Sequence, residues 1–184
     1  MKNNIFSLRT LIIIALLAAL AAVLKAFFSI PIAPAGLKTV DVSLTPIPVM
    51  LAGIFFGPLA GFLAGFVADT AGYFLGVQIG AYNPVFSVTM GLFGVIAGLF
   101  YLKSKRNTIL KVTAASASAQ IIVSVIINTV VIWLYYGVPL AALLPTRLIA
   151  AAVELPVYAW LLMLLIEALR PLIAKISKQQ IVQT

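Results

Sequence analysis

The chain has 184 residues, of which 64% are hydrophobic and 9% are charged, with a mean hydropathy of +1.20. This composition excludes a soluble domain, whose surface needs far more polar side chains. The sequence has no Cys and no His, which excludes disulfides, the usual zinc sites and the usual nucleophile–base pairs. We therefore expect one membrane domain over residues 1–184, without catalytic residues, metal ligands or cofactors.

The net charge of +8 follows the expected membrane topology rather than a nucleic-acid partner. Basic residues collect in cytoplasmic loops, and here nine cations flank apolar runs: Lys2, Arg9, Lys103, Lys105, Arg106, Lys111, Arg170, Lys175 and Lys178. Three cations fall outside these clusters: Lys25, Lys38 and Arg147. If the clusters face the cytoplasm, these three lie toward the outside, where they are suited to capturing an anion.

Apolar segments predict six helices, at about 8–28, 46–56, 58–76, 84–102, 109–136 and 145–170. The second is too short to cross a membrane alone, so we expect it to sit within the bundle. Pro46, Pro58, Pro84 and Pro145 stand near proposed helix starts, where a missing N–H costs nothing. The fold class is thus an all-α membrane protein, a single bundle of six transmembrane helices with both termini cytoplasmic.

The first apolar segment resembles a signal peptide, but we expect it to be retained as the first span. The loops 29–45, 77–83 and 137–144 then lie outside. The loop 29–45 has an alternating Lys38-Thr39-Val40-Asp41-Val42 stretch. Its length suits a lid over a site, and equally a simple tether with a strand-like part.

Small residues recur with helical spacing in two segments. In the third helix, Gly61 and Gly65, then Gly72 and Gly76, predict close packing between helices. The first helix carries a series of alanines that forms either a packing face or a surface for a partner protein: Ala15, Ala18, Ala19, Ala22 and Ala26.

Charged residues at membrane depth are costly and usually functional. Asp69 lies two turns below the outer end of the third helix, and Arg147 is expected in the first turn of the sixth. A cation there opposes the helix macrodipole, so either Asp69 or an anionic ligand should hold it. Glu154 follows on the same face, about 10 Å deeper. Lys25 is expected to snorkel to the interface.

Amide and aromatic side chains add further candidates near the outer end. Asn83 precedes Pro84 and suits an N-cap, although its amide also faces the outer cavity. Asn128 lies within the fifth helix, and Trp133, Tyr135 and Tyr136 follow it. Aromatics at this depth most often form the interfacial belt, so one or two of them should line a cavity.

Nearly the whole chain resembles the S components of energy-coupling factor (ECF) vitamin transporters, most closely the folate-specific branch. The resemblance rests on the first-helix alanines and on several segments: PIPVMLAGIFFGPLAGFLAGFVADTAGYF, YNPVFSVTMGLFGVIAGLFY, INTVVIWLYYG and LLPTRLIAAAVELP. It implies a subunit of the bacterial cytoplasmic membrane that binds its vitamin from outside and has no ATPase activity. Its partners would be a transmembrane T component and two cytoplasmic ATPases, with the alanine face against the T component.

For folate, the resemblance implies three kinds of contact. The planar pterin would stack on Trp133, Tyr82 or Phe86, and its edge would pair with Asp69, Asn83 or Asn128. The carboxylates of the glutamate tail would bind Lys38 or Arg147. The loop 29–45 would close over the site.

Three alternatives remain at this point. The first is an S component for another vitamin, such as riboflavin or thiamine, although the outer cations disfavour cationic thiamine. The second is an intramembrane enzyme, against which the missing His and four scattered acids speak. The third is a purely structural subunit without a tight ligand.

Overall fold

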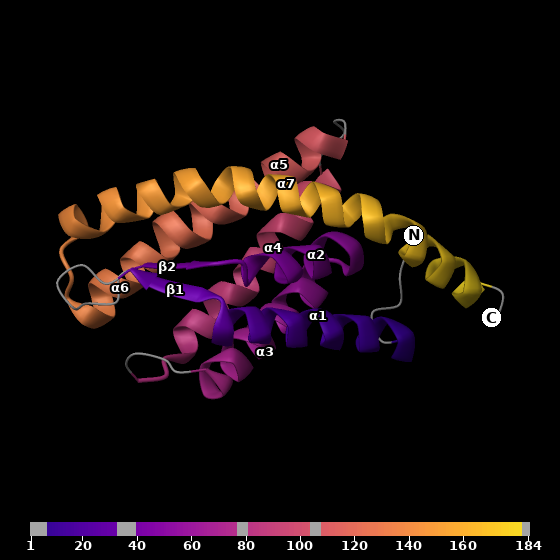
Figure 1. Cartoon of the computed structure of the whole chain (residues 1–184), viewed down its shortest axis with the longest axis horizontal. Helices are drawn as coiled ribbons and strands as arrows, with labels where there is room; N and C mark the ends of the chain where they lie inside the picture. Colours follow the sequence, from indigo (N-terminus) through magenta and orange to yellow (C-terminus); the bar gives the residue numbers. More distant parts are fainter. Residues whose placement is uncertain (1–6, 33–39, 77–80, 104–107, 182–184) are drawn as a thin grey trace.

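The computed structural model describes residues 7–32, 40–76, 81–103 and 108–181. Lys38 lies outside the described residues, and so does the tip of the loop predicted at 29–45. Where the structure describes the chain, it is a helical bundle with a single two-stranded hairpin beside it (Figure 1).

Six helical segments follow one another, as predicted. They are α1 (Leu8–Phe27), α2 (Pro46–Phe56), α3 (Pro58–Leu75), α4 (Pro84–Lys103), a fifth segment and α7 (Leu140–Ile181). The fifth consists of α5 (Thr108–Ala119), the π-helix η2 (Gln120–Ile127) and α6 (Asn128–Tyr136). In the described part of the chain, five of these segments are long and apolar enough to cross a membrane. The all-α membrane fold is therefore confirmed.

Three of the four helix starts marked by proline are confirmed, because α2, α3 and α4 begin at Pro46, Pro58 and Pro84. The fourth is wrong, since α7 begins at Leu140 and Pro145 lies inside it. Pro139 directly precedes the helix, and its carbonyl accepts hydrogen bonds from the N–H groups of Ala142 and Leu143. Pro145 lies in the second turn, where the helix lacks the hydrogen bond that an N–H would donate to the carbonyl of Ala141.

The short helix α2 occupies the centre of the bundle, as its length predicted. Ten of its 11 residues are buried, and it packs against α1, α3 and α4. Helices α3 and α4 meet at glycines: a Cβ atom on Gly94 would lie 2.5 Å from the Cα of Gly61. The predicted packing role of Gly61, Gly65 and Gly72 is confirmed, because a Cβ on any of them would come within 3.0 Å of a neighbouring helix.

The hairpin follows α1 directly. Strands β1 (Ser29–Ile32) and β2 (Val40–Ser43) pair antiparallel, with Ser29 opposite Ser43 and Ile32 opposite Val40. The strand-like stretch predicted in this loop is therefore a real strand, and β2 contacts α7. The structure adds this small hairpin to a fold that was expected to be entirely helical.

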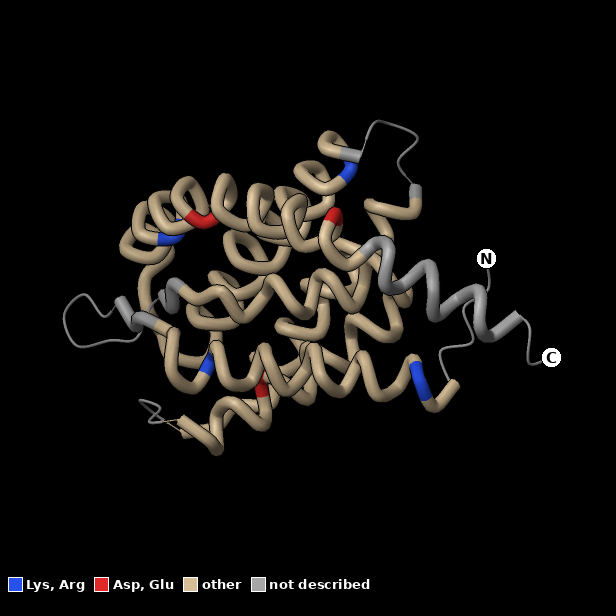
Figure 2. The backbone as a smooth tube through the Cα atoms, turned by 45° about the vertical axis from the view of Figure 1, so that its right-hand side comes forward, with Lys and Arg blue, Asp and Glu red and all other residues tan. Residues whose placement is uncertain are grey.

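The two ends of the bundle differ. The start of α1 and the end of α7 lie at one end, and the hairpin and the turn between α6 and α7 lie at the other (Figure 1). We call the latter the hairpin end. Charged residues are few along the described backbone (Figure 2). The direction of this bundle in the membrane, with both termini cytoplasmic, stays a prediction from the charge clusters.

Candidate ligand-binding site

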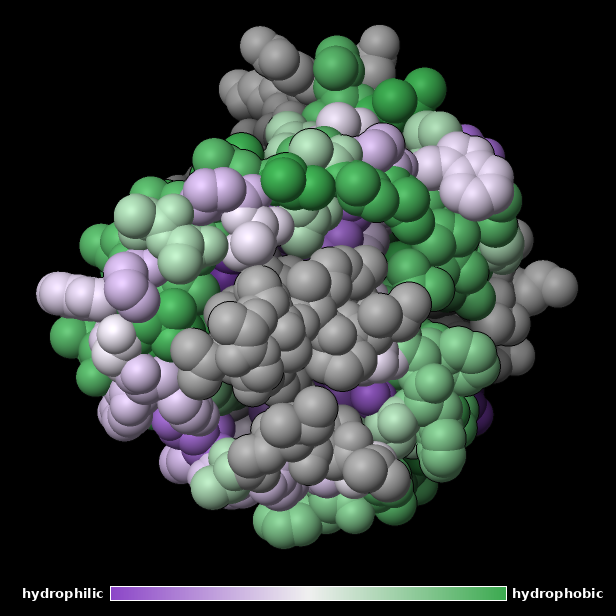
Figure 3. Space-filling view, turned by 60° about the vertical axis from the view of Figure 1, so that its left-hand side comes forward, coloured by the Kyte–Doolittle hydropathy of each residue, from purple (hydrophilic) through white to green (hydrophobic). Residues whose placement is uncertain are grey.

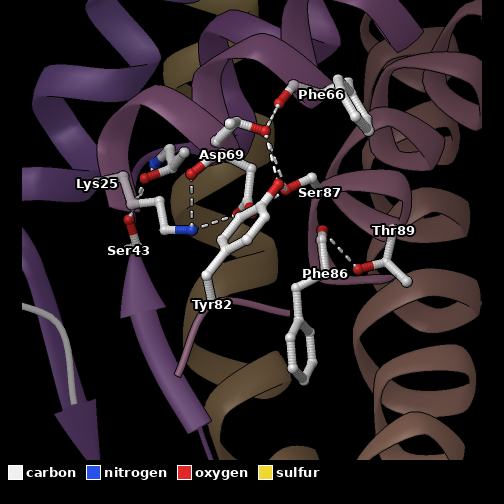
Figure 4. Close-up of polar contacts among 10 residues, drawn as sticks. Lys25, Ser43, Phe66, Asp69, Tyr82, Phe86, Ser87 and Thr89 are labelled. Atoms are coloured by element: carbon white, nitrogen blue, oxygen red, sulfur yellow. Dashed lines mark hydrogen bonds and ion pairs between the residues drawn. The ribbon is translucent and has the colours of Figure 1, made fainter. Parts of the chain in front are cut away.

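An ion pair joins α1 to α3 near the hairpin end (Figure 4). The ammonium group of Lys25 contacts Oδ1 of Asp69 and also donates to the backbone oxygen of Asp69 at 3.2 Å. Both side chains are largely buried, with exposures of 14% and 6%. Of the two partners considered for Arg147, Asp69 is therefore paired with Lys25 instead. The prediction that Lys25 snorkels to the interface is wrong, because the buried carboxylate of Asp69 holds it.

A group of hydroxyls continues from this ion pair, as Figure 4 shows. Ser87 on α4 donates to Oδ2 of Asp69 at 2.8 Å. The hydroxyl of Tyr82 lies 2.9 Å from Oγ of Ser87 and 3.0 Å from Oγ1 of Thr70. Thr70 in turn donates to the backbone oxygen of Phe66. Both side-chain oxygens of Asp69 thus accept hydrogen bonds from groups of the protein itself.

Tyr82 also belongs to an aromatic wall. Its ring lies 5.1 Å from that of Tyr73 and 5.4 Å from that of Phe74. Phe86, one turn into α4, stacks on Tyr136 at the end of α6 with centroids 6.4 Å apart. These pairs bring aromatic faces from α3, α4 and α6 to the same end of the bundle.

An open depression of about 450 Å³ lies at this wall. It is lined by Ala81, Tyr82, Asn83, Pro84, Val85, Tyr135 and Tyr136. Two predicted ligand contacts, Tyr82 and Asn83, are among them, and the two tyrosines of α6 complete the wall. Figure 3 looks toward the hairpin end, where hydrophobic residues gather mainly on one side and more hydrophilic residues on the other.

The two predicted amides have different surroundings. The side-chain oxygen of Asn83 accepts the N–H of Val85 at 3.1 Å, so the predicted cap of α4 is confirmed. Asn128 begins α6, directly after the π-helix. Its Oδ1 is buried and has no hydrogen-bond partner among the described residues. A buried acceptor of this kind is costly unless a donor reaches it.

Arg147 lies at the contact between α7 and the π-helix. Its Nη1 donates to the backbone oxygen of Ser124 at 3.0 Å, and the residue is 6% exposed. It lies in the second turn of α7 rather than the first, which corrects the predicted position. The macrodipole argument that motivated an anionic partner is weaker there, because the effect falls off after the first turn.

Seven residues further along α7, Glu154 contacts the same π-helix. Gln120 donates its side-chain amide to Oε2 of Glu154, and both residues are buried. Arg147 and Glu154 of α7 thus meet Ser124 and Gln120 of η2. π-Helical turns recur at functional sites.

Trp133 and Lys38 stand apart from the groups above. Trp133 is 46% exposed on α6 and is not among the residues that line the depression. Its predicted stacking role therefore stays a prediction. Lys38 lies outside the described residues, so its role as an anion contact stays a prediction.

Several functional candidates were missed because their partners are distant in sequence. Ser87 and Thr70 are ordinary helix residues until α3 and α4 bring them to Tyr82. Tyr136 was one of three aromatic residues of which one or two were expected to line a cavity, and its contact with Phe86 was not predicted. Aromatic residues on both sides of the expected outer cavity were the only signal for this wall.

The alanine face of α1 divides into two parts. Ala15 and Ala19 are exposed and Ala26 is partly exposed, whereas Ala18 and Ala22 are buried. Ala18 belongs to a cluster with Phe56, Ala60 and Ala64. The prediction that all five alanines form a docking face is therefore wrong for Ala18 and Ala22, because these two pack inside the bundle.

Comparisons with known proteins agree on one family. Residues 9–173 match the model of the ECF transporter substrate-specific component. A curated relative, "Folate transporter FolT" of Clostridium novyi (strain NT), is 30% identical over 113 residues. That match covers 61% of this chain and 64% of the relative, which is a little under two thirds of its length.

Two solved structures are similar in fold. One is described as "Crystal structure of FolT bound with folic acid", with a TM-score of 0.70 and 29% identity over 83% of this chain and 91% of that one. The other is described as "Structure and mechanism of the S component of a bacterial ECF transporter", with a TM-score of 0.60 and 28% identity over 86% and 96%. The chain belongs to the substrate-specific components of ECF transporters, multi-pass membrane proteins that are not enzymes.

Proposed function

We propose that the chain captures folate from outside a bacterial cell, in the cytoplasmic membrane, for import by a partner module. The observation that carries this proposal is the fold and sequence likeness to a FolT structure that contains folic acid. The partners would be a transmembrane T component and two cytoplasmic ATPases. The hairpin end would face outside, because the clusters of basic residues gather at the opposite end of the expected topology.

The wall at the hairpin end suits a planar, hydrogen-bonding ligand. The rings of Tyr82, Phe86 and Tyr136 offer faces for stacking the pterin. The buried Oδ1 of Asn128 needs a donor, and the pterin edge carries N–H donors. Asn83 lines the same depression and offers its amide N–H groups.

The anionic tail of folate needs a different partner. Arg147 already holds the π-helix through Ser124, so we assign it to supporting the site. Lys38 is then the cation proposed for the glutamate carboxylates. Asp69 is assigned an indirect role, because Lys25 and Ser87 occupy its carboxylate oxygens.

The other ligands first considered, riboflavin and thiamine, are disfavoured by the likeness to folate proteins. A thermal-shift comparison of the purified chain with folic acid, riboflavin and thiamine tests the proposal. Folic acid should raise the melting temperature most, because a ligand that binds only the folded state stabilises it. A larger shift with riboflavin or thiamine would contradict the folate assignment. No shift with any vitamin would favour a purely structural subunit.

A further inference from the structure

Lys25 reaches Asp69 because α3 has no side chain in its way. Gly72 lies one turn after Asp69 on α3, and a Cβ atom there would lie 2.9 Å from Cβ of Lys25 and 3.1 Å from its Cδ. The aliphatic stem of Lys25 therefore runs against the backbone of α3. A buried ion pair is costly to desolvate and is weak evidence for stability alone, so this arrangement calls for another role.

The second carboxylate oxygen of Asp69 determines which way the hydroxyl of Ser87 donates its hydrogen bond. An ionised carboxylate only accepts hydrogen bonds, so Ser87 must donate its single proton to Asp69. Oγ of Ser87 is then left as an acceptor, with the hydroxyl of Tyr82 at 2.9 Å and that of Thr70 at 3.2 Å. Lys25 contacts Oδ1 of Asp69, which leaves Oδ2 for Ser87.

We propose that Lys25 and Asp69 are positioning residues that orient Tyr82 in the ligand wall, so that the placement of α1 and the affinity for ligand are coupled. The relay runs from Lys25 on α1 through Asp69 on α3 and Ser87 on α4 to Tyr82 (Figure 4). Tyr82 lines the depression, whereas Lys25 and Asp69 do not. This inference rests on the proposed function, since it names how the same site is shaped.

The relay also connects α1 to the ligand site, although the exposed residues of this helix do not line the depression. Leu16 and Leu20 are exposed on α1, while Lys25 in its last turn is tied inward. Moving this helix would strain the ion pair first and then the hydroxyls that orient Tyr82. Contacts made on the exposed face of α1 would thereby change ligand release, with a coupling in the usual range of about 5- to 150-fold.

The test compares ligand kinetics in Lys25→Met, in Ser87→Ala and in the variant that combines them. Stopped-flow tryptophan fluorescence with folic acid gives the association and dissociation rates of each purified protein. Each single change should raise the dissociation rate at least about tenfold, with the association rate within about twofold of wild type. In the combined variant the rise should not exceed the larger single effect, because both changes cut one relay.

Two further variants separate this role from a general loss of stability. Thr10→Val removes a buried hydroxyl at the other end of α1, where Thr10 bonds Ser7, and should leave both rates unchanged. If Lys25→Met does not fold, Lys25→Met with Asp69→Asn removes both buried charges. That protein should fold and still release folic acid faster, because an amide does not fix the direction of the Ser87 proton.

Wild-type rates in the folded Lys25 variants, or effects that multiply in the combined variant, would overturn the relay. Ligand binding by the wild-type protein shows whether the relay or the proposed function has failed. If it does not bind folic acid but binds riboflavin or thiamine, folate is the wrong ligand, and the same rates measured with the bound vitamin decide the relay.

Discussion

The hydroxyl of Tyr158 on α7 donates a hydrogen bond to the backbone oxygen of Ser43, 115 residues earlier in the chain. Ser43 ends β2, and its own hydroxyl accepts the N–H of Thr45 at 3.1 Å. All three residues are buried. The end of the hairpin that leads into α2 is thus fixed to the longest helix of the bundle.

Removing the hydroxyl in Tyr158→Phe should lower the stability of the protein by about 1–3 kcal/mol, because the buried carbonyl of Ser43 loses its donor. Thermal melting in detergent measures this effect. Tyr101→Phe is the matched control, since Tyr101 also loses a hydroxyl but packs against the core on α4. Equal melting temperatures for the two variants would show that the bond to Ser43 contributes nothing.

The effects on stability of replacing Gln120 and Glu154 should not be additive, because the two side chains contact each other. Glu154→Leu leaves the buried amide of Gln120 without its acceptor, which should cost about 1–3 kcal/mol. Replacing both residues by Leu should restore part of the loss, because the amide of Gln120 no longer remains alone, whereas Ser43 and Tyr158 still lose their contacts with Glu154. Ser116→Ala is the control, since among the described residues the hydroxyl of Ser116 bonds within α5, to the carbonyl of Thr113. Additive losses in the double variant would contradict this pairing.

The divided alanine face predicts different outcomes for two similar changes. Ala19→Trp adds bulk to an exposed position, so the protein should fold and bind folate but should not support uptake with the T component and ATPases. Ala22→Trp should prevent folding, because Ala22 is buried and its carbonyl lies against Gly72. Uptake assays and size-exclusion profiles measure the two effects. Normal uptake in Ala19→Trp would exclude this face as the docking surface.

Gly94→Ala should be strongly destabilising, although it adds only one methyl group. The added carbon would lie 2.5 Å from the Cα of Gly61, and backbone cannot rotate away as a side chain can. We expect low expression and a lower melting temperature. Ala114→Gly, on an exposed part of α5, is a control for a single methyl change in a helix. A stable Gly94→Ala protein would mean that α3 and α4 are further apart.

The sequence predicted the helices well, because proline marks three of their starts and apolar runs mark their lengths. It did not predict the pairing of Lys25 with Asp69. That contact depends on how α1 and α3 are rotated about their axes, and uniformly apolar helices give little information on rotation. The π-helix was missed for a related reason: Gln120 and Ser124 look like ordinary helix residues until α7 places Glu154 and Arg147 beside them.

The ligand site was predicted in part. Tyr82 and Asn83 line the depression, because the chain between α3 and α4 must pass the hairpin end. Trp133 was one of three aromatic residues proposed for stacking, whereas Tyr135 and Tyr136 are the residues of α6 that line the depression. The rotation of α6 about its axis decides which of its aromatic residues face the depression. The π-helical turns that precede α6 change this rotation, and the sequence does not reveal them.

Equilibrium titration of the purified chain with folic acid tests the central claim most directly. Isothermal calorimetry should show saturable binding of one folic acid per chain, with the same affinity in the presence and absence of ATP. Asn83→Ala should weaken this binding, and Ser116→Ala should not. Saturable binding of riboflavin or thiamine without any binding of folic acid would contradict the account.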